Sequence, residues 1–436
     1  MLGSDRSSSS REAFISVFAD RRQLVILLMG FSSGLPLLLG FSTLSYWLAG
    51  EGITLGAIGA LVAVSAPYSL KFLWAPVFDL VSLPIFAKRL GRRRSWLLLI
   101  QLLLILSIIT LGSCHPRENL ALLAAAALIM AFLSASQDII IDAYRIEILE
   151  EREQGAGAAS TQIGYRAGLL ASGAGAIALS AVLSWFWVYT IMAALVAIGV
   201  VAATIAPEPK SSMIAHSGSS QKNGADFLKR FKDNVFLPFS ELLSRPGIIF
   251  VLVFIIFYKY GDAIAGAMAN PFYNQLGFTP LEIASVTKVF GVAATLVGIA
   301  VGGLLVTWLN VWPALLIGGI CQAATNVLFA LLAKAGPDVY LLGVAVGLDN
   351  FAGGLASTAL VAYLSGLCHK SYTGTQFALL TSFMALGRTI LAVPSGAIAG
   401  EFGWVLFFLL TTALAVPGII LLIWIRRYPI GSSTRK

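Results

Sequence analysis

The sequence predicts an all-α polytopic membrane protein with twelve transmembrane helices, arranged as two six-helix pseudo-repeats. Of its 436 residues, 58% are hydrophobic and 11% are charged, whereas soluble proteins carry about 25% charged residues. Twelve apolar runs have about the 20 residues or more that a helix needs to cross a bilayer core. The longest hydrophilic stretch, 207–246, lies between the sixth and seventh runs. A soluble enzyme is therefore excluded, and 26 Phe and 9 Trp exclude a disordered chain.

The apolar runs and their flanking charges predict the topology. The first run follows Arg21 and Arg22 without a small-residue cleavage site, so we interpret it as a retained span. Basic residues concentrate in loops on the side of the N-terminus, while the opposite loops hold Arg117 and Lys334. The positive-inside rule then places both termini in the cytoplasm. The same distribution explains the net charge of +8, because the basic residues flank membrane spans on one side of a lipid bilayer. We therefore expect no nucleic acid as a partner. The predicted spans are 24–48, 57–79, 95–113, 119–145, 157–182, 184–206, 247–269, 282–307, 312–334, 339–366, 373–399 and 403–425.

We expect three parts: an N-terminal six-helix bundle at 1–206, a cytoplasmic linker at 207–246 and a C-terminal six-helix bundle at 247–436. The linker is Ser-rich, and its end predicts an interfacial helix over 225–245, with Phe227, Leu228, Phe231 and Val235 on one stripe. The halves look duplicated. Residues 52–58 resemble 277–283, and a Gln precedes an Arg by the same spacing at 154 and 166 as at 376 and 388.

Charged residues inside the spans point to the site. Each costs about 2.5–3.5 kcal/mol at bilayer depth, so these residues must face a wet cavity or pair between helices. Cations from both halves favour an anionic, polar ligand, because arginine binds carboxylates through a bidentate fork. We predict that the substrate-binding residues are Arg166, Lys259, Lys288, Arg388, Asp262, Asp349, Gln137, Tyr165, Tyr258 and Gln376; Lys71 is a further cation inside a span.

Two aspartates on the fourth span suggest proton coupling. Asp138 and Asp142 are spaced i and i+4, so they lie one above the other on one helix face. Like charges so placed repel, and one carboxyl group takes up a proton unless a cation compensates it. Asp138 is the deeper of the two, and we favour it as the titrating group. A permanent ion pair between Asp138 and Arg166 is the alternative.

Several other patterns exclude enzymatic chemistry. The three cysteines and three histidines are scattered, so the sequence predicts no disulfide, no metal site and no cofactor. Residues 30–34, GFSSG, match the nucleophile-elbow pattern literally. That pattern requires a strand–turn–helix setting, and here it lies in an apolar span without a His-Asp pair. We therefore expect a protein that is not an enzyme.

Several motifs resemble the bacterial muropeptide (AmpG-type) permease family of the major facilitator superfamily. They are YSLKFLWAP at 68–76, GRRRSW at 91–96, SASQD at 134–138, GAGAA at 155–159 with GYR at 164–166, YKYGDA at 258–263 and TQFALL at 375–380. Those in the first half also resemble the eukaryotic acetyl-coenzyme A transporters. The loop after Asp79 resembles the superfamily's loop motif, which implies a gating latch between Asp79 and Arg92, Arg93 or Arg94; charge topology alone is the alternative.

The resemblance implies a function. Such a protein imports N-acetylglucosaminyl-1,6-anhydro-N-acetylmuramyl peptides, which are anionic glycopeptides, from periplasm to cytoplasm with protons for peptidoglycan recycling. It lies in the bacterial inner membrane, and we expect a monomer. Two alternatives remain open: an acetyl-coenzyme A-type anion transporter of the same superfamily, and a non-transporting membrane assembly factor on that fold.

Overall fold

The computed structural model describes residues 20–83, 87–209 and 235–427, and every regular element assigned in these ranges is helical. The chain divides into two compact units. Unit 1 comprises Met1–Pro238 and Cys368–Ser382, and unit 2 comprises Phe239–Leu367 and Phe383–Lys436. The boundary therefore falls inside one helix, α21 (Thr373–Ala392), whose first half packs with unit 1.

Nine helical segments of the described chain are long and apolar enough to cross a membrane. They are Arg21–Gly50, Arg92–Gly112, Leu120–Ile148, Trp185–Ile205, Ile248–Leu276, Leu281–Leu309, Val311–Ala335, Val339–Leu367 and Ser395–Arg427. The last of these contains a break at Gly403, which has φ of 70°, so the predicted boundary near 399–403 coincides with a real change of direction.

The other three predicted spans are helical but interrupted. The second span is built from α4 (Leu55–Ala60), η1 (Leu61–Ser65), α5 (Ala66–Leu70), η2 (Lys71–Leu73) and α6 (Ala75–Leu80). Pro67 and Pro76 each lie in the first turn of one of these pieces, where the missing N–H costs no helical hydrogen bond. The fifth span consists of α10 (Gln154–Leu170), η4 (Ala171–Gly175) and α11 (Ala176–Ser180). The eleventh is α21, which ends before Pro394.

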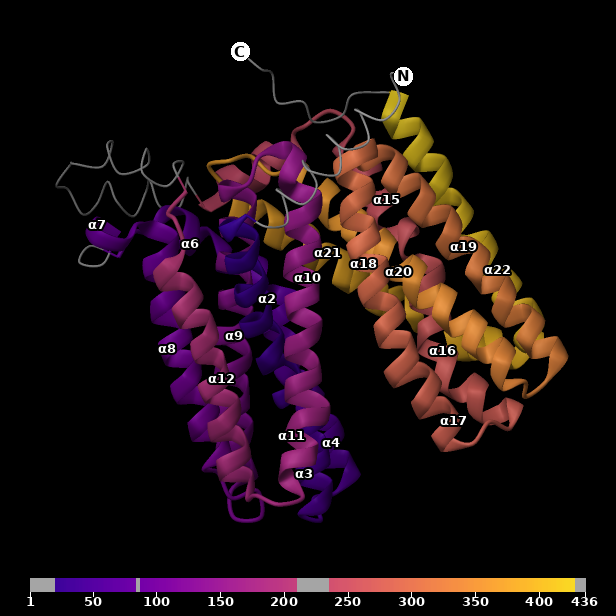
Figure 1. Ribbon diagram of the computed structural model, residues 1–436, viewed down its shortest axis with the longest axis horizontal. Helices are drawn as coiled ribbons and strands as arrows, with labels where there is room; N and C mark the ends of the chain where they lie inside the picture. The colour runs from indigo at the N-terminus through magenta and orange to yellow at the C-terminus, as the bar shows by residue number, and fades with distance from the viewer. Residues whose placement is uncertain (1–19, 84–86, 210–234, 428–436) are drawn as a thin grey trace, which may run out of the picture. The chain divides into compact units, whose positions relative to one another are not determined.

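The long helices of unit 1 pack side by side, as Figure 1 shows. They are α2 (Arg21–Leu39), α8 (Arg92–Gly112), α9 (Leu120–Ile148), α10 and α12 (Trp185–Ile205). Among the shorter elements that connect them along the chain are α3 (Ser42–Gly50), α7 (Ala87–Leu90) and η3 (Glu151–Glu153). Trp47 stacks on Trp185 with ring centroids 5.4 Å apart. Tyr189 donates from its hydroxyl to the Leu39 carbonyl at 2.9 Å.

Glycine allows α2 and α10 to touch through their backbones. A Cβ on Gly164 would lie 2.0 Å from the Leu27 carbonyl oxygen, and one on Gly30 would lie 2.4 Å from the Thr161 carbonyl oxygen. Both approaches are shorter than any real Cβ contact. Small residues are the usual means of close helix packing in membranes.

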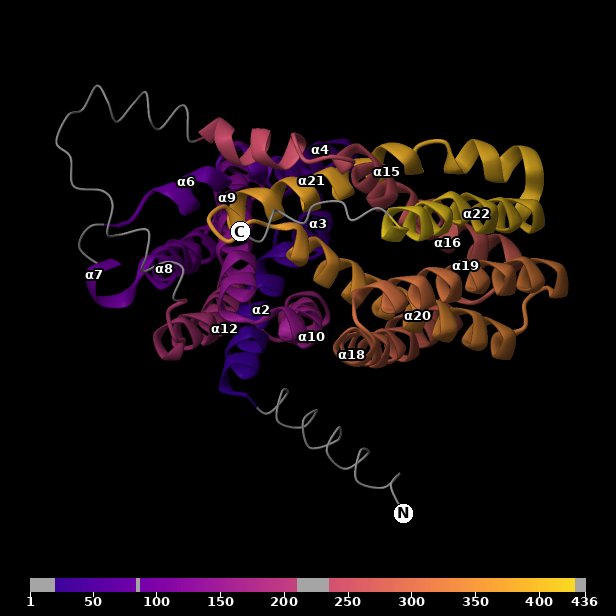
Figure 2. The same cartoon turned by 90° about the horizontal axis from the view of Figure 1, so that it is seen from above.

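Unit 2 has a second bundle, in which α18 (Gly291–Leu309), α19 (Val311–Ala335), α20 (Val339–Leu367) and α22 (Ser395–Arg427) lie together when seen from above (Figure 2). Phe272, Phe329 and Phe408 form its aromatic core, with the rings of Phe272 and Phe408 4.8 Å apart. The helices are α15 (Ile248–Tyr258), α16 (Tyr260–Leu276), α17 (Pro280–Ala284), η5 (Ser285–Phe290), α18 (Gly291–Leu309), α19 (Val311–Ala335), α20 (Val339–Leu367) and α22 (Ser395–Arg427).

The predicted duplication has a structural counterpart in the backbone. Gly52 and Gly277, aligned by their sequence context, both adopt positive φ, at 77° and 94°. Gly91 and Asn310, which begin α8 and α19, share one unusual conformation, with φ of 83° and 68° and ψ of 172° in both. The second match was invisible in the sequence because the two residue types differ.

The predicted interfacial helix falls mostly outside the described residues. Phe227, Leu228 and Phe231 lie in the undescribed range, and the chain is helical over 235–243.

At the N-terminal end of α2, Asp20 caps the helix by accepting from the backbone N–H of Arg22 at 2.7 Å. Hydrogen bonds from the Arg22 side chain hold the pKa of Asp20 below its usual value.

Candidate functional site

Asp79, at the end of the broken second span, is the centre of a buried ionic cluster in unit 1. Its Oδ1 lies 2.7 Å from Arg93 Nη2, and both side chains are fully buried. Arg93 also pairs with Glu147 of α9 and donates to the Phe78 carbonyl at 3.1 Å. The cluster thus joins α6, α8 and α9 through one guanidinium, as charge-assisted hydrogen bonds allow.

The first turn of α21 completes this cluster. Asp79 Oδ2 accepts from the backbone N–H and the hydroxyl of Thr375, both at 2.7 Å. Arg93 donates to the Thr373 hydroxyl at 3.1 Å, and that hydroxyl donates to Glu147. Glu147, Thr373 and Thr375 were not predicted from the sequence. Glu147 lies just after the predicted fourth span, which ends at residue 145, so the sequence offered no reason to expect it as a partner of Arg93.

The three predicted latch arginines have different roles. Arg93 makes the ion pair with Asp79, and Arg92 donates to the Asp79 backbone carbonyl. Arg94 instead donates to the carbonyl oxygens of Ala203 and Thr204 at the end of α12. Glu208 accepts from the backbone N–H of Arg93 at 3.0 Å. Gly91 has φ of 83°, which favours glycine, and a Cβ there would also displace the Glu208 carboxyl group, whose carbon would lie 2.2 Å away.

Asp138 and Asp142 lie on one face of α9, as predicted, but they have different partners. The Ser33 hydroxyl of α2 donates to Asp138 Oδ1 at 2.5 Å. Asp142 pairs with Arg145, one turn further along α9, at 3.6 Å. The guanidinium of Arg145 also lies over the Phe377 ring, 5.3 Å from its centroid. The two carboxylates therefore differ in compensation, because only one has an arginine within 4.0 Å among the described residues.

The alternative ion pair between Asp138 and Arg166 is absent. Arg166 is an exposed side chain on α10, and within the described ranges it has no carboxylate within 4.0 Å. The cation within electrostatic range of both Asp138 and Asp142 is Lys71. Lys71 was recognised as a charge inside a span but was not predicted as a site residue. Tyr165 neighbours Arg166 and is half-buried, while Gln137 is fully buried beside Asp138.

A second polar network lies in unit 2 and involves Lys259 and Asp262. Lys259 Nζ donates to Asp262 Oδ2 at 3.2 Å and to Gln322 Oε1 at 3.1 Å. Gln322 of α19 in turn donates from its amide to Asp262. The i and i+3 pair predicted from the sequence is thus an ion pair that a glutamine from another helix bridges.

Asp349 of α20 belongs to the same neighbourhood. The Thr325 hydroxyl donates to Asp349 Oδ1 at 3.0 Å, and Thr325 lies one turn after Gln322 on α19. The charges of Asp262 and Lys259 act on Asp349, so two carboxylates share one lysine. Gln322 and Thr325 were missed because polar, uncharged residues are common in apolar spans.

Of four other predicted substrate-binding residues, two have side chains that bond to the backbone of the fold, and two have side chains that the structure does not describe. The Tyr258 hydroxyl donates to the Leu315 carbonyl at 2.9 Å. The Gln376 side chain donates to the Pro238 carbonyl and accepts from the His369 N–H, at 3.1 and 2.7 Å. These bonds serve the fold. Lys288 lies in η5 and Arg388 in α21, and their side chains are outside the described part of the structure.

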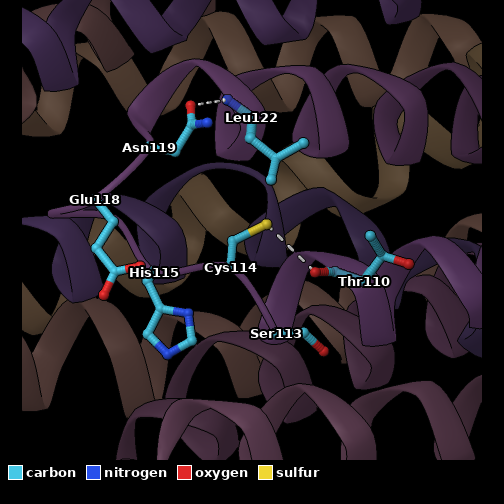
Figure 3. A pocket seen from close by; sticks show the side chains of 7 residues that line it. All are labelled: Thr110, Ser113, Cys114, His115, Glu118, Asn119 and Leu122. Atoms are coloured by element: carbon cyan, nitrogen blue, oxygen red, sulfur yellow. Dashed lines mark hydrogen bonds between the residues drawn. The ribbon is translucent and has the colours of Figure 1, made fainter.

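One pocket, drawn in Figure 3, lies at the loop between α8 and α9, away from these residues. It has a volume of about 220 Å³. Cys114 donates from its thiol to the Thr110 carbonyl at 3.4 Å, and burial raises the pKa of this thiol. The described residues contain no group of three or more His, Cys, Asp or Glu placed to hold a metal ion. The lining residues are Thr110, Ser113, Cys114, His115, Glu118, Asn119 and Leu122.

Comparison with known proteins identifies the fold and the family. Residues 24–392 match the model of the Major Facilitator Superfamily. Two solved structures share the fold: the proton:xylose symporter XylE, with a TM-score of 0.68 over 96% of both chains at 12% identity, and the human organic anion transporter MFSD10, with a TM-score of 0.61 over 93% of this chain and 97% of that one at 18% identity. At these identities the likeness concerns the fold alone.

Two curated relatives are considerably more similar. The anhydromuropeptide permease of Escherichia coli strain K12 is 38% identical over 416 residues, which are 95% of this chain and 82% of that protein. The putative transporter AmpG 4 of Rickettsia felis is 34% identical over 94% of this chain and 98% of its own. These relatives are named as a permease and a transporter, which confirms that the chain is a transporter and not an enzyme. The chain belongs to the AmpG-type permeases of the major facilitator superfamily.

Proposed function

We propose that this chain is a proton-coupled importer of N-acetylglucosaminyl-1,6-anhydro-N-acetylmuramyl peptides, which it moves from periplasm to cytoplasm by alternating access for peptidoglycan recycling. The observation that carries the substrate class is the 38% identity to an anhydromuropeptide permease across 95% of this chain. On this proposal the protein is a monomer in the bacterial inner membrane, with both termini cytoplasmic and two six-helix halves joined by 207–246.

The distribution of charge supports an anionic glycopeptide as substrate. Arg166 is exposed and has no carboxylate within 4.0 Å in the described chain, so its fork is free to bind a peptide carboxylate in the bidentate manner. Lys288 and Arg388 are proposed for the same role. In unit 2, two carboxylates share Lys259, and the excess negative charge suits an ammonium group of the peptide.

Asp138 is the proposed proton carrier. It receives one hydrogen bond from Ser33, and the arginine nearest to it on α9 pairs with Asp142 instead. A carboxylate at this depth without an ion pair within 4.0 Å is costly in its charged form. Asp79 and Arg93, with Glu147 and the first turn of α21, are proposed as the latch that holds one conformation of the transport cycle.

Uptake measurements test the proposal. Purified protein in liposomes should accumulate radiolabelled anhydromuropeptide when an inward pH gradient is imposed, and should only equilibrate it without one. Excess unlabelled muropeptide should compete, and excess coenzyme A thioester should not. Competition by the thioester alone would favour the acetyl-coenzyme A alternative. Inserted protein with no uptake of either compound would favour a non-transporting role.

A further inference from the structure

Lys71 is a buried cation without a direct partner. It begins the short 3-10 turn η2 inside the second span, and 8% of its surface is exposed. Within residues 20–83, 87–209 and 235–427, no carboxylate lies within 4.0 Å of its ammonium and no hydrogen bond from that group is formed. A charge at membrane depth costs about 2.5–3.5 kcal/mol even on a lenient scale. Lys71 therefore needs a counter-charge that the described residues do not supply at contact distance.

Other buried polar groups lie near Lys71 and Asp138. Tyr68 precedes Lys71 by one turn, and its hydroxyl adjoins the Ser134 hydroxyl and Asp138, so the two hydroxyls can partner each other. Both amide atoms of Gln137, the residue before Asp138 on α9, form no hydrogen bond to described residues. More than nine in ten buried polar groups in proteins have a partner. The Lys71 ammonium, the Tyr68 and Ser134 hydroxyls and the Asp138 carboxylate thus come from η2, α5 and α9, and this set of groups suits a polar ligand that carries a carboxylate.

The charged groups facing Asp138 divide into two sets. Arg145 pairs with Asp142 at 3.6 Å, so these two largely compensate each other. Lys71 then remains as the cation available to Asp138, from which it is separated by more than 4.0 Å. Ser33 of α2 and Tyr68 are polar, uncharged neighbours of Asp138, and Tyr165 in turn adjoins Tyr68. Trp74 fixes η2 against α9 by donating from its indole N–H to the Ser136 hydroxyl at 3.0 Å.

We propose that Lys71 and Asp138 together take up one carboxylate of the substrate and one proton. The substrate carboxylate binds the Lys71 ammonium through charge-assisted hydrogen bonds. Asp138 then loses its compensating charge and binds the proton. One negative and one positive charge enter, so the net charge of the site is unchanged, and no covalent bond of the substrate forms or breaks. The Tyr68 and Ser134 hydroxyls beside Asp138 then serve as hydrogen-bonding partners for the sugar hydroxyl groups.

This inference rests on the proposed function and adds its coupling step. It assigns to Lys71 the compensating role that the sequence suggested for Arg166. A merely structural role for Lys71 would affect folding and stability, but it would not link the proton count to the charge of the ligand. That link is therefore the property to measure.

The first experiment uses unaltered protein in weakly buffered detergent with a pH indicator. Binding of anhydromuropeptide should remove about one proton per substrate from solution. An analogue whose peptide carboxylates are all amidated should bind with no proton uptake. Equal proton uptake with both compounds would overturn the inference, and this comparison needs no mutant to fold.

The second experiment compares Lys71→Gln, Lys71→Arg and the double variant Lys71→Gln/Asp138→Asn, with the exposed Lys334→Gln as control. Lys71→Gln should bind muropeptide at least about tenfold more weakly, about 1.4 kcal/mol, without proton uptake. Lys71→Arg should retain part of both. The double variant should show counterflow exchange that is independent of pH. Proton uptake by Lys71→Gln equal to that of Lys334→Gln would overturn the inference alone. Failure of the unaltered protein to bind muropeptide would overturn the proposed function as well.

Discussion

Asp79 and Arg93 form a fully buried ion pair, 2.7 Å between Oδ1 and Nη2, while the second oxygen of Asp79 receives two hydrogen bonds from Thr375. One carboxylate thus fastens the start of α21 to the helices α6 and α8. Removing one partner of a buried pair leaves an uncompensated charge, which costs about 3–5 kcal/mol. Glu147 partly offsets that cost here, because it also pairs with Arg93.

Asp79→Asn should therefore weaken the latch and shift the population towards the inward-open conformation. A loss of about 1 kcal/mol changes the ratio of two conformations roughly fivefold. Cysteines placed near the cytoplasmic mouth should react faster with maleimide in the variant than in the parent. Arg117→Gln, which removes an exposed ion pair with Glu51, is the control. Unchanged labelling in Asp79→Asn would show that this residue is not a latch.

Arg166→Lys and Arg388→Lys should impair transport while the protein remains inserted. Each change preserves the charge but loses the bidentate fork. We expect the apparent affinity for muropeptide to fall by about tenfold, or about 1.4 kcal/mol, in substrate-concentration series of counterflow exchange. Immunoblots of the membrane fraction control for insertion. Normal kinetics in both variants would leave these arginines a role in helix packing.

Asp138→Asn should abolish accumulation driven by a pH gradient and spare counterflow exchange, because asparagine mimics the protonated side chain. Asp142→Asn should remain coupled but unfold at lower temperature, because Arg145 is fully buried and loses its carboxylate. Accumulation assays and thermal unfolding in detergent separate the two effects. If Asp138→Asn still accumulates substrate in response to a pH gradient, Asp138 is not the proton carrier. Asp262 and Asp349 are then the next candidates.

Gly164→Ala should destabilise unit 1. A Cβ there would lie 2.0 Å from the Leu27 carbonyl oxygen, so α2 and α10 must separate. Forcing extra atoms into a packed interface costs about 1–3 kcal/mol. Gly50→Ala is the matched control, because a Cβ on Gly50 meets nothing within 4 Å. The midpoint of heat-induced loss of the monodisperse peak in size-exclusion chromatography measures the effect, and equal midpoints for the two variants would contradict the close approach.

Cysteine labelling should establish the topology. Arg117 and Arg152 have side chains that are 70% and 77% exposed, and the positive-inside rule places them on opposite sides. In cells with a permeabilised outer membrane, an impermeant maleimide should modify Arg117→Cys and not Arg152→Cys. Background from Cys114 should be slow at neutral pH, because burial raises the pKa of its thiol and the thiolate is the reactive form. Modification of Arg152→Cys and not of Arg117→Cys would show that the chain crosses the membrane in the opposite orientation.

The features of the site that depend on local helix or loop geometry could be predicted from the sequence. The spacing of Asp138 and Asp142 placed both on one face of α9, and the short loop after Asp79 brought an arginine to it. Partners from distant helices were not predictable, because Lys71 could not be aligned with α9 without knowing the break at η2. Pro67 and Pro76 could have indicated the break, because each lies in the first turn of a new helical piece, but a hydropathy profile does not take prolines into account.

The broken second span has a consequence for how the protein is made. Its short helical pieces are not among the nine described segments that are long and apolar enough to cross a membrane, and it carries Lys71 and Asp79. Arg93, which pairs with Asp79, and Asp138, which is proposed to act together with Lys71, follow this span in the chain, so they leave the ribosome later. We expect nascent chains that stop before α9 to hold this segment at the translocon, unreleased into lipid. Integration of the second span is thus completed by residues translated some sixty positions after it.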